Sequence, residues 1–554
     1  MKKEILQVLQ NVSPIQLEEH ALERPAYAHL GDFALPCFQF AKVLRKSPAI
    51  IAEEIAASIK HPSIRKAEAV NGYVNIFLDR TRITSEILHA VVEQGATYGS
   101  SNEGKDGVVT IDLSSPNIAK PFSMGHLRST VIGNSIALLM EKSGFKAVKI
   151  NYIGDWGTQF GKLLTAYRKW GTEEDVRKAP IETLLTLYIR FHEEAEQDPS
   201  LNDEGRAAFK ALEDGDADAL ALWKWFKEES LSEFQRIYDL LGVEFDSYNG
   251  EAYYNDKMEP VVQELEEKRL LVESDGAQVV DLGEAIPPCL IRKSDGATLY
   301  ATRDLTAAMD RKNTYDFVKS IYVVGNEQSL HFTQVKQVLN KMGYAWSDDM
   351  HHVPFGLILQ DGKKMSTRKG KIVLLEQVLT EAIDLAHRNI AEKNPTLANQ
   401  KEVAEAVGVG AILFSDLKQH RKHDIEFNLE TMLQVEGETG PYIQYTNARA
   451  HSVLRKAGEV SAFVVNEVND FEWETIKLLE QFPQAVKRAT EELDPSVIAK
   501  YAVDLAQAFN SFYGNVKVLT DAAHLSYRAA LIQSVSIVLT ESMRLLGMKA
   551  PEEM

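Results

Sequence analysis

The sequence of 554 residues is poor in cysteine and has no long apolar segment. Its two cysteines, Cys37 and Cys289, are far apart and form no CxxC pair, which excludes a disulfide scaffold and a cysteine-based zinc site. No uninterrupted apolar run reaches the roughly 18 residues that a membrane-spanning helix needs. The first residues include Glu4 and no apolar stretch, so no secretory signal is expected. We therefore expect a cytoplasmic protein without membrane contact.

Basic residues are also in deficit. The chain has 61 Lys and Arg against 80 Asp and Glu, a formal net charge of −19. This is not the balance of a protein that coats nucleic acid, so contact with a polyanion has to use local basic patches. Hydrophobic residues make up 45% of the chain and charged residues 25%, as in ordinary globular proteins. At roughly 150 residues per domain, the length predicts three or four domains.

Three ranges differ in their local pattern, and we expect a domain in each. Residues 1–106 combine helical apolar spacing with a strand-like segment, which predicts an α+β domain. Residues 107–400 alternate strands and helices, which predicts a Rossmann-like α/β domain with a parallel sheet. Residues 401–554 repeat a 3.6-residue apolar period, which predicts an all-α helical bundle.

Chemistry in the middle range is expected in the loops that follow its strands. The short β-branched runs at 108–113, 147–152 and 320–324 predict parallel strands, and 158–241 predicts a helical insertion. Ligands of such sheets bind beyond the carboxyl ends of the strands. The loops concerned are 114–125, 154–158, 325–331 and 361–371.

The first of these loops joins a strand to a helix predicted over about 125–142. Gly125 permits a ligand to approach the backbone, and His126 lies at the helix start, where free N–H groups and the dipole favour a phosphate. An imidazole there can donate a hydrogen bond that strengthens as charge develops in a transition state. Taken alone, a Gly-His pair at such a turn is more often a simple helix cap.

The second signal is a basic segment in an acidic chain. Between Gln360 and Lys371 stand five basic residues, Lys363, Lys364, Arg368, Lys369 and Lys371. Flanking glycines predict a mobile loop that can close over a polyphosphate. The alternative interpretation is a solvated run of charge.

The Gly-His turn and a Lys-Met-Ser loop about 240 residues later together resemble the two signatures of class I aminoacyl-tRNA synthetases. Longer strings resemble arginyl-tRNA synthetases: SSPNIAKP, GHLRST, NYIGDWGTQFGKL, YATRDLTAA, VEGETGPYIQYTNAR and, near the N-terminus, GDFALPCFQFAK. The resemblance covers nearly the whole chain. It implies a ligase that uses ATP, with accompanying Mg²⁺ but no dedicated protein metal site, to form arginyl-adenylate from L-arginine and transfer the arginine to the 3′ terminal adenosine of its tRNA. It also implies that activation needs tRNA.

The resemblance assigns both loops to ATP. The implied catalytic residues are His126, Lys120, Lys364 and Arg368, and the implied ATP-binding residues are Pro116, Ser123, Gly125, His126, Lys363, Met365 and Ser366. Ser123 stands where the family usually has a histidine, so a weaker ATP contact or a compensating partner is expected. The second signature lacks the lysine that often follows its serine, and Lys120 or Arg368 is expected to neutralise a phosphate instead.

Arginine recognition is expected on one helical turn. Tyr300 and Asp304 are four residues apart and face the same side of a helix. By resemblance, Asp304 pairs with the guanidinium and Tyr300 packs beside it; the other implied arginine-binding residues are Asp112, Ser115, Asn117 and Gln328. The alternative for Asp304 is an ordinary salt bridge to Arg303. A polar pocket of this kind rejects analogues such as citrulline by roughly 10⁴–10⁵-fold, and no editing insertion is evident.

The resemblance implies that the helical range 401–554 is an anticodon-binding domain, in which aromatic side chains stack on bases and cations contact phosphates. The candidates are Tyr442, Tyr445 and Arg449. At least half of the aromatic residues of this range are expected to be plain core instead, among Tyr442, Tyr445, Phe509, Phe512 and Tyr513. The nearly neutral N-terminal range is expected to meet another part of the tRNA, and the protein is taken as a monomer.

Other interpretations stay open. A synthetase for another amino acid is disfavoured by the Tyr300–Asp304 pair. A non-catalytic tRNA-binding paralogue is favoured only by Ser123. A generic nucleotidylyltransferase explains both phosphate loops but not the helical C-terminal range. Trp156 is expected to be core packing that shapes the pocket, and the pair at 351–352 is expected to be structural or exposed because no third ligand stands at metal spacing.

Overall fold

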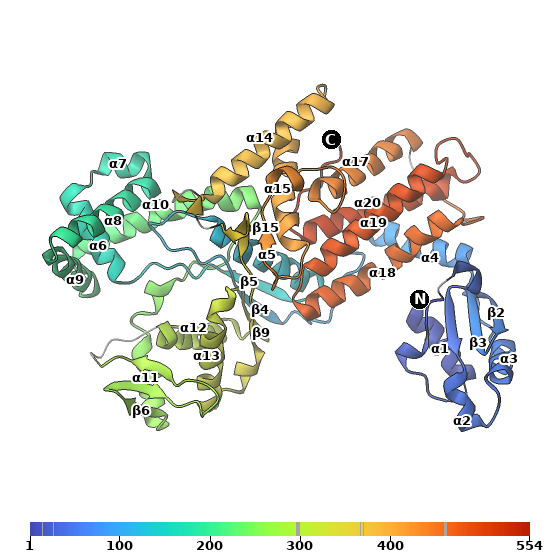
Figure 1. The fold of residues 1–554 in the computed structure, drawn as a ribbon, viewed down its shortest axis with the longest axis horizontal. Helices are drawn as coiled ribbons and strands as arrows, with labels where there is room; N and C mark the ends of the chain where they lie inside the picture. The colour runs from blue at the N-terminus through green and yellow to red at the C-terminus, as the bar shows by residue number, and fades with distance from the viewer. Residues whose placement is uncertain (14, 26, 295–299, 366, 369–370, 459–461) are drawn as a thin grey trace. The chain divides into compact units, whose positions relative to one another are not determined.

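The computed structural model describes residues 1–554 except 14, 26, 295–299, 366, 369–370 and 459–461 (Figure 1). The chain divides into two compact units. The first comprises Met1–Tyr98, Arg449–Pro483 and Asp504–Leu539; the second comprises Gly99–Ala448, Gln484–Val503 and Thr540–Met554. Four long C-terminal helices contribute residues to both units: α17 (Gly440–Ala457), α18 (Asp470–Glu492), α19 (Ser496–Asn515) and α20 (Leu525–Leu545). The division of the sequence into three domains stays a prediction.

The N-terminal part of the first unit is a three-stranded antiparallel sheet with helices, as expected for an α+β domain. Its strands are β1 (Phe33–Pro36), β2 (Ile64–Val70) and β3 (Tyr73–Leu78), and its helices are α1 (Lys2–Val12), α2 (Ala41–Leu44), α3 (Pro48–Ser58) and α4 (Arg80–Gln94). Strand β3 is central, in the order β1–β3–β2. The Asp32 carboxylate accepts hydrogen bonds from the Leu78 backbone N–H and the Trp473 indole, both at 2.9 Å, and so ties this sheet to α18.

The second unit is built on a four-stranded parallel sheet in the order β10–β9–β4–β5. Its strands are β4 (Val108–Asp112), β5 (Lys146–Ile150), β9 (Lys319–Tyr322) and β10 (Met350–His352). The first three confirm the strands predicted from sequence. Strand β10 was not predicted, because three residues are too few to carry a periodic signal. Since β5 and β9 lie on opposite sides of β4, the order of the strands reverses beside β4.

Helix α5 (Leu127–Lys142) connects β4 to β5 and is buried along nearly its whole length. It therefore lacks the polar face of a surface helix. Two of its charged residues are buried as ion pairs, Arg128 with Asp416 and Lys142 with Glu541. Gly133 lets the helix approach the sheet, because a Cβ at this position would lie 2.4 Å from the Leu113 Cβ.

The expected helical insertion is present as five helices: α6 (Thr158–Trp170), α7 (Glu173–Lys178), α8 (Pro180–Gln197), α9 (Ser200–Glu213) and α10 (Ala217–Leu241). An antiparallel sheet that the sequence did not predict follows, with β6 (Leu271–Ser274), β7 (Ala277–Val280) and β8 (Cys289–Arg292). It packs with α11 (Met258–Glu267), α12 (Tyr300–Tyr315) and α13 (Ser329–Lys341) around one apolar core.

The segment expected to be a loop at 361–371 contains short strands. Strand β12 (Lys363–Lys364) pairs with β11 (Ile358–Gln360), which also pairs with β15 (Ile425–Glu426), and β13 (Thr367–Arg368) pairs with β14 (Lys371–Ile372). These strands are too short to show an apolar alternation in the sequence. The helices α14 (Leu375–Lys393), α15 (Gln400–Leu417) and α16 (Leu429–Met432) complete the unit. None of the described helices combines the length and apolar composition needed to cross a bilayer.

Replacing Gly133 by alanine should destabilise the second unit, because the added methyl group has to push α5 away from Leu113. We expect a loss of about 1–3 kcal/mol, measured by urea denaturation. Gly514→Ala is the matched control: this glycine is also helical, but a Cβ there meets no atom within 4 Å, so stability should be unchanged or slightly higher. Equal stability of both variants would contradict the close packing described here.

Candidate active site

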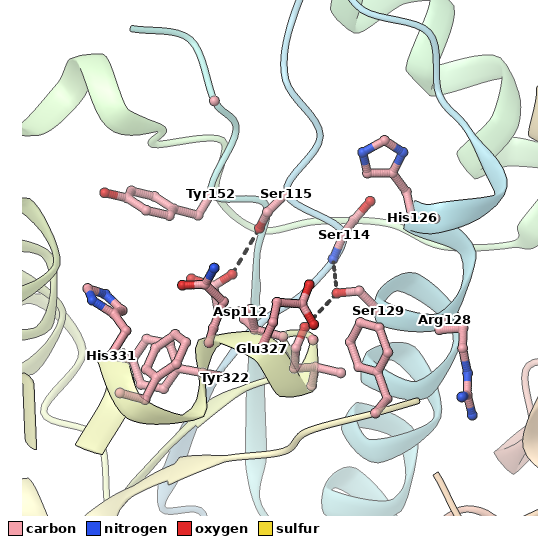
Figure 2. Close-up of a pocket in the computed structure, with 18 of the residues that line it drawn as sticks. Asp112, Ser114, Ser115, His126, Arg128, Ser129, Tyr152, Tyr322, Glu327 and His331 are labelled. Atoms are coloured by element: carbon pink, nitrogen blue, oxygen red, sulfur yellow. Dashed lines mark hydrogen bonds between the residues drawn. The ribbon is translucent and has the colours of Figure 1, made fainter. Parts of the chain in front are cut away.

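A cavity of about 680 Å³ lies at the carboxyl ends of β4 and β9, beside the reversal of strand order. Asp112 and Tyr322, the last residues of these strands, both line it (Figure 2). Ligands of open parallel sheets bind at this position. The cavity therefore lies where the sequence placed the chemistry.

Both predicted loops and the predicted turn of α12 reach this cavity. The predicted residues that line it are Asp112, Ser115, Asn117, Gly125, His126, Tyr300, Asp304, Gln328, Lys364 and Met365. They come from segments separated by as much as 253 residues of chain, from Asp112 to Met365. One cavity thus brings together the helix start at His126, the basic segment at Lys364 and the carboxylate of Asp304.

Four other predicted residues do not line the cavity: Pro116, Lys120, Ser123 and Lys363. The Lys120 ammonium lies 6.0 Å from the centre of the Tyr188 ring, and Lys363 is exposed on β12. Ser366 lies outside the described residues, and so does the side chain of Arg368.

His126 ends a short 3₁₀ helix, Met124–His126, that leads into α5. The backbone N–H of Ser123 donates a hydrogen bond to His126 Nδ1 at 3.1 Å. Burial lowers the pKa of His126, which favours the neutral imidazole. Because Nδ1 accepts, the proton of that neutral ring lies on Nε2, which is then a hydrogen-bond donor. Ser123, expected from the signature to contact ATP, thus orients the histidine through its backbone.

The loop after β4 is held in an unusual backbone conformation. Ser114 and Ser115 have positive φ values of 71° and 52°, which non-glycine residues rarely adopt. The Ser114 N–H donates to Ser129 Oγ at 2.9 Å (Figure 2). The Ser115 N–H donates to Asn151 Oδ1 at 3.2 Å. These bonds offset the strain and hold the loop against α5 and β5.

Asp112 is buried below this loop and is fully engaged. It accepts a hydrogen bond from Ser115 Oγ at 3.0 Å and forms an ion pair with Arg311 at 2.9 Å. Burial raises the pKa of Asp112, and Arg311 opposes this shift. A buried ion pair needs such extra hydrogen bonds to be stable. Asp112 and Arg311 therefore form a rigid polar floor of the cavity.

Further carboxylates line the cavity. Asp304 accepts a hydrogen bond from His331 Nε2 at 2.5 Å, and this histidine, not the neighbouring Arg303, is its partner. Glu251 also lines the cavity, and burial raises its pKa to about 7, with a further contribution from the charges of Asp155 and Asp304. Tyr300 is 67% exposed at the rim. These carboxylates suit a cation with several N–H donors.

Several residues of the cavity were missed by sequence reasoning: Arg128, Tyr152, Glu251, Arg311, Tyr322, Glu327 and His331. A signal existed for Glu327 and His331, because both lie in the loop 325–331, where chemistry was expected. Glu251 follows a glycine outside any predicted loop of the sheet, and only the fold brings it to Asp304.

The remaining residues singled out from the sequence are structural. Trp156 packs edge-on against Phe209 and Trp223, is only half-buried and does not line the cavity, so the expectation of a core residue that shapes the pocket was wrong. His352 is half-buried, with Nε2 2.9 Å from the Val324 carbonyl oxygen. Within the described part of the chain, no cluster of three His, Cys, Asp or Glu side chains is arranged to hold a metal ion.

The tRNA candidates lie on α17. In the second unit, Tyr442 is half-buried and Tyr445 is 39% exposed. In the first unit, Arg449 donates to Asn510 Oδ1 at 2.5 Å and lies 5.8 Å from the Tyr513 ring. Phe509 and Phe512 are fully buried, whereas Tyr513 is 38% exposed. Two of the five aromatic candidates are therefore core, and the expectation that at least half of them are was wrong.

Comparisons with known proteins agree with this arrangement. Residues 87–429 match the catalytic domain of class I tRNA synthetases for arginine, 443–554 the DALR anticodon-binding domain and 1–78 the arginyl-tRNA synthetase N-terminal domain. Arginine–tRNA ligase of Exiguobacterium sibiricum is 57% identical over 100% of both chains, and that of Ligilactobacillus salivarius is 56% identical over 96% of this chain and 95% of the relative.

Solved structures show the same fold. Arginyl-tRNA synthetase of Thermus thermophilus matches with a TM-score of 0.82 at 27% identity, with full coverage of both chains. The Plasmodium falciparum enzyme matches with a TM-score of 0.80 at 25% identity, over 100% of this chain and 99% of that one.

The parallel sheet, the cavity at its reversal point and the two loops that meet there define the catalytic domain of a class I aminoacyl-tRNA synthetase. An N-terminal α+β domain and a C-terminal helical domain accompany it, which confirms the expected fold class. On the strength of these matches, the chain belongs to the arginyl-tRNA synthetase family, as the sequence strings predicted.

Because the pKa of Glu251 is raised, we expect the free energy of unfolding to depend on pH. The folded protein holds this carboxyl protonated up to about pH 7, whereas in the unfolded chain it ionises near its ordinary, lower pKa. Stability contributed by the neutral form is therefore present in acid and lost as the pH rises to 7. Glu251→Gln should raise the melting temperature more at pH 8 than at pH 5. Glu213→Gln, on the exposed end of α9, is the control and should have the same small effect at both pH values.

Proposed function

We propose that this chain joins L-arginine to its tRNA in two steps. In the first, a carboxylate oxygen of arginine attacks the α-phosphorus of ATP, which forms arginyl-adenylate and releases pyrophosphate. In the second, a hydroxyl of the terminal adenosine of tRNA attacks the activated carbonyl and releases AMP. One observation carries the proposal: His126 and Lys364 line the same cavity as Asp304 and Glu251, so groups suited to phosphate and to a cation face one space.

On the ATP side, the chain acts by position and charge. The Nε2–H of His126 can donate to a phosphoryl oxygen, a bond that strengthens as charge moves toward the leaving pyrophosphate. Lys364 supplies a cation at the mouth, with Lys120 and Arg368 as the further candidates for neutralising phosphates. The other ATP contacts that we propose are Pro116, Ser123, Gly125, Lys363, Met365 and Ser366. ATP enters as its Mg²⁺ complex, since phosphate oxygens and water are the ligands that Mg²⁺ favours.

On the arginine side, recognition requires acceptors for a planar guanidinium. Asp304 can accept from it while His331 holds the carboxylate in place, and Glu251 adds a second acceptor when ionised. Tyr300 covers the aliphatic stem from the rim. Asn117 and Gln328 contact the α-amino and carboxyl groups, and the Asp112–Ser115 pair supports them from the floor.

For tRNA, the C-terminal match to an anticodon-binding domain supports contact through the helical part of the chain. Tyr445 can stack with an unpaired base, Tyr442 supports it, and Arg449 can reach a phosphate. The N-terminal domain contacts a separate part of the tRNA. We further propose that the protein acts in the cytoplasm as a monomer.

The alternative of a non-catalytic paralogue is disfavoured. It rested on Ser123, yet the backbone N–H of this residue orients His126 whatever side chain it carries. The alternative of a generic nucleotidylyltransferase does not explain why residues 443–554 match an anticodon-binding domain. The deciding assay is exchange of labelled pyrophosphate into ATP with each amino acid, with and without tRNA. Exchange with arginine alone, appearing when tRNA is added, supports the proposal; tRNA binding without any exchange supports the paralogue.

His126→Ala should lower kcat for pyrophosphate exchange by about 10²–10³-fold, because it removes a donor that acts mainly in the transition state. The KM for arginine should change little. His351→Ala, a half-buried histidine of β10 outside the cavity, should leave both constants unchanged. Equal losses of kcat and arginine affinity in His126→Ala would show that the assigned role is wrong.

Asp304→Asn should weaken arginine binding by about 10- to 100-fold, because a hydrogen-bonded charged partner of the guanidinium is lost. The KM for ATP should stay within twofold. Asp310→Asn, on the same helix but outside the cavity lining, is the matched control and should bind arginine normally. An unchanged arginine KM in Asp304→Asn would move the guanidinium contact elsewhere, to Glu251 in the first instance.

A further inference from the structure

Arg128 is a charged side chain buried in the second unit, at 1% exposure, although it stands two residues after His126. Its Nε forms an ion pair with Asp416 Oδ2 on α15 at 3.3 Å, and Asp416 is itself 3% exposed. Its Nη1 donates to the backbone carbonyl of His423 at 2.8 Å. Figure 2 shows the side chains of His126 and Arg128 leaving the start of α5 in different directions. Arg128 therefore contacts protein groups beyond the helix.

Arg128 contacts the turn at 421–424, and this turn also makes hydrogen bonds with the segment that precedes strand β11. The Gly356 N–H donates to the Arg421 carbonyl at 3.0 Å, and the Leu357 N–H donates to Asp424 Oδ1 at 2.7 Å. A Cβ at Gly356 would lie 2.7 Å from the His423 carbonyl oxygen, so the two segments are in direct backbone contact. The chain before β11 thus rests on the turn at 421–424.

Strand β11 in turn carries the basic segment. Leu359 pairs with Lys364, and the Met365 N–H donates to the Ile358 carbonyl at 2.8 Å. On its other edge, β11 pairs with β15, which directly follows the turn at 421–424. A continuous set of contacts therefore leads from Arg128 through the His423 carbonyl and β11 to Lys364 and Met365.

A contribution to folding stability alone does not explain why a charged arginine occupies this buried position. Replacing a buried ion pair by apolar side chains is often neutral, because desolvation cancels most of the attraction. The Nη2 of Arg128 is buried and makes no hydrogen bond in the described part of the chain, which adds to the cost. A planar guanidinium can, however, hold a carboxylate and a carbonyl at once in a fixed geometry.

We propose that Arg128 is a positioning residue: it sets the Lys364–Met365 strand pair relative to His126, so that both contact one ATP molecule. This rests on the proposed use of ATP. The consequence is selective, since a shift of the strand pair alters contacts with the phosphates and leaves the carboxylates of Asp304 and Glu251 in place.

The test compares Arg128→Met and Arg128→Lys with Lys142→Met in pyrophosphate exchange with arginine and tRNA. Lys142 is the matched control, because it lies on the same helix and forms an equally buried ion pair with Glu541 at 2.9 Å, far along α5 from His126. We expect Arg128→Met to raise the KM for ATP at least tenfold with the KM for arginine within twofold. Arg128→Lys should recover part of the loss, since a lysine can reach one of the two partners. Lys142→Met should lower the melting temperature with an unchanged KM for ATP.

An unchanged KM for ATP in the Arg128 variants, or the same rise in Lys142→Met, would overturn the proposal. Equal losses for ATP and arginine would do so as well. If Arg128→Met does not fold, Arg128→Lys is measured on its own against the same criteria. Calorimetric titration of ATP into the wild type and the variants keeps this result separate from the proposed reaction: an absence of exchange in the wild type contradicts the reaction, whereas equal ATP affinity in all proteins contradicts only the role of Arg128.

Discussion

Parallel pairing of β4 with two neighbours is the constraint on which the site depends. Because the strands run in the same direction, Asp112 and Tyr322 end at the same edge of the sheet. Because β5 and β9 lie on opposite sides of β4, the connections after β4 and β9 diverge and leave a cavity between them. The close approach of α5 to β4 at Gly133 then fixes where the helix starts and so where His126 stands.

Charge is distributed in the cavity according to two different needs. A chain with a net charge of −19 readily supplies a wall of carboxylates for a cationic substrate, and Asp304 and Glu251 stand there. Phosphates instead require hydrogen-bond donors and positive charge. The chain supplies a donor from the neutral imidazole of His126 and a positive charge from Lys364 on the β11–β12 strand pair. Local arrangement thus overcomes an unfavourable overall field. The neutral state of His126 follows from burial, which lowers its pKa.

The fold was largely predictable in elements that are long enough to show a pattern of apolar or β-branched residues in the sequence itself. The three strands β4, β5 and β9 and helix α5 carry enough β-branched or apolar residues to be recognised. Strand β10 and the strands around Lys364 are two or three residues long, so pairing with distant partners alone makes them strands. The same holds in the site. Tyr300 and Asp304 share a helical turn and were found together, whereas Glu251 joins them across 50 residues of chain.

The sequence by itself determined the family, the Gly-His turn, the basic segment at 360–371 and the helical turn that offers Asp304, because these depend on residue types at short spacing. The tertiary structure decided what each group can do: that Asp304 is held by His331 instead of Arg303, that Nδ1 of His126 accepts and Nε2 donates, and that Lys120 lies beside Tyr188 away from the cavity lining. The physical reason is that burial, ion pairing and the direction of a hydrogen bond are set by neighbours in space. Those neighbours are brought together only when the sheet and its crossovers form.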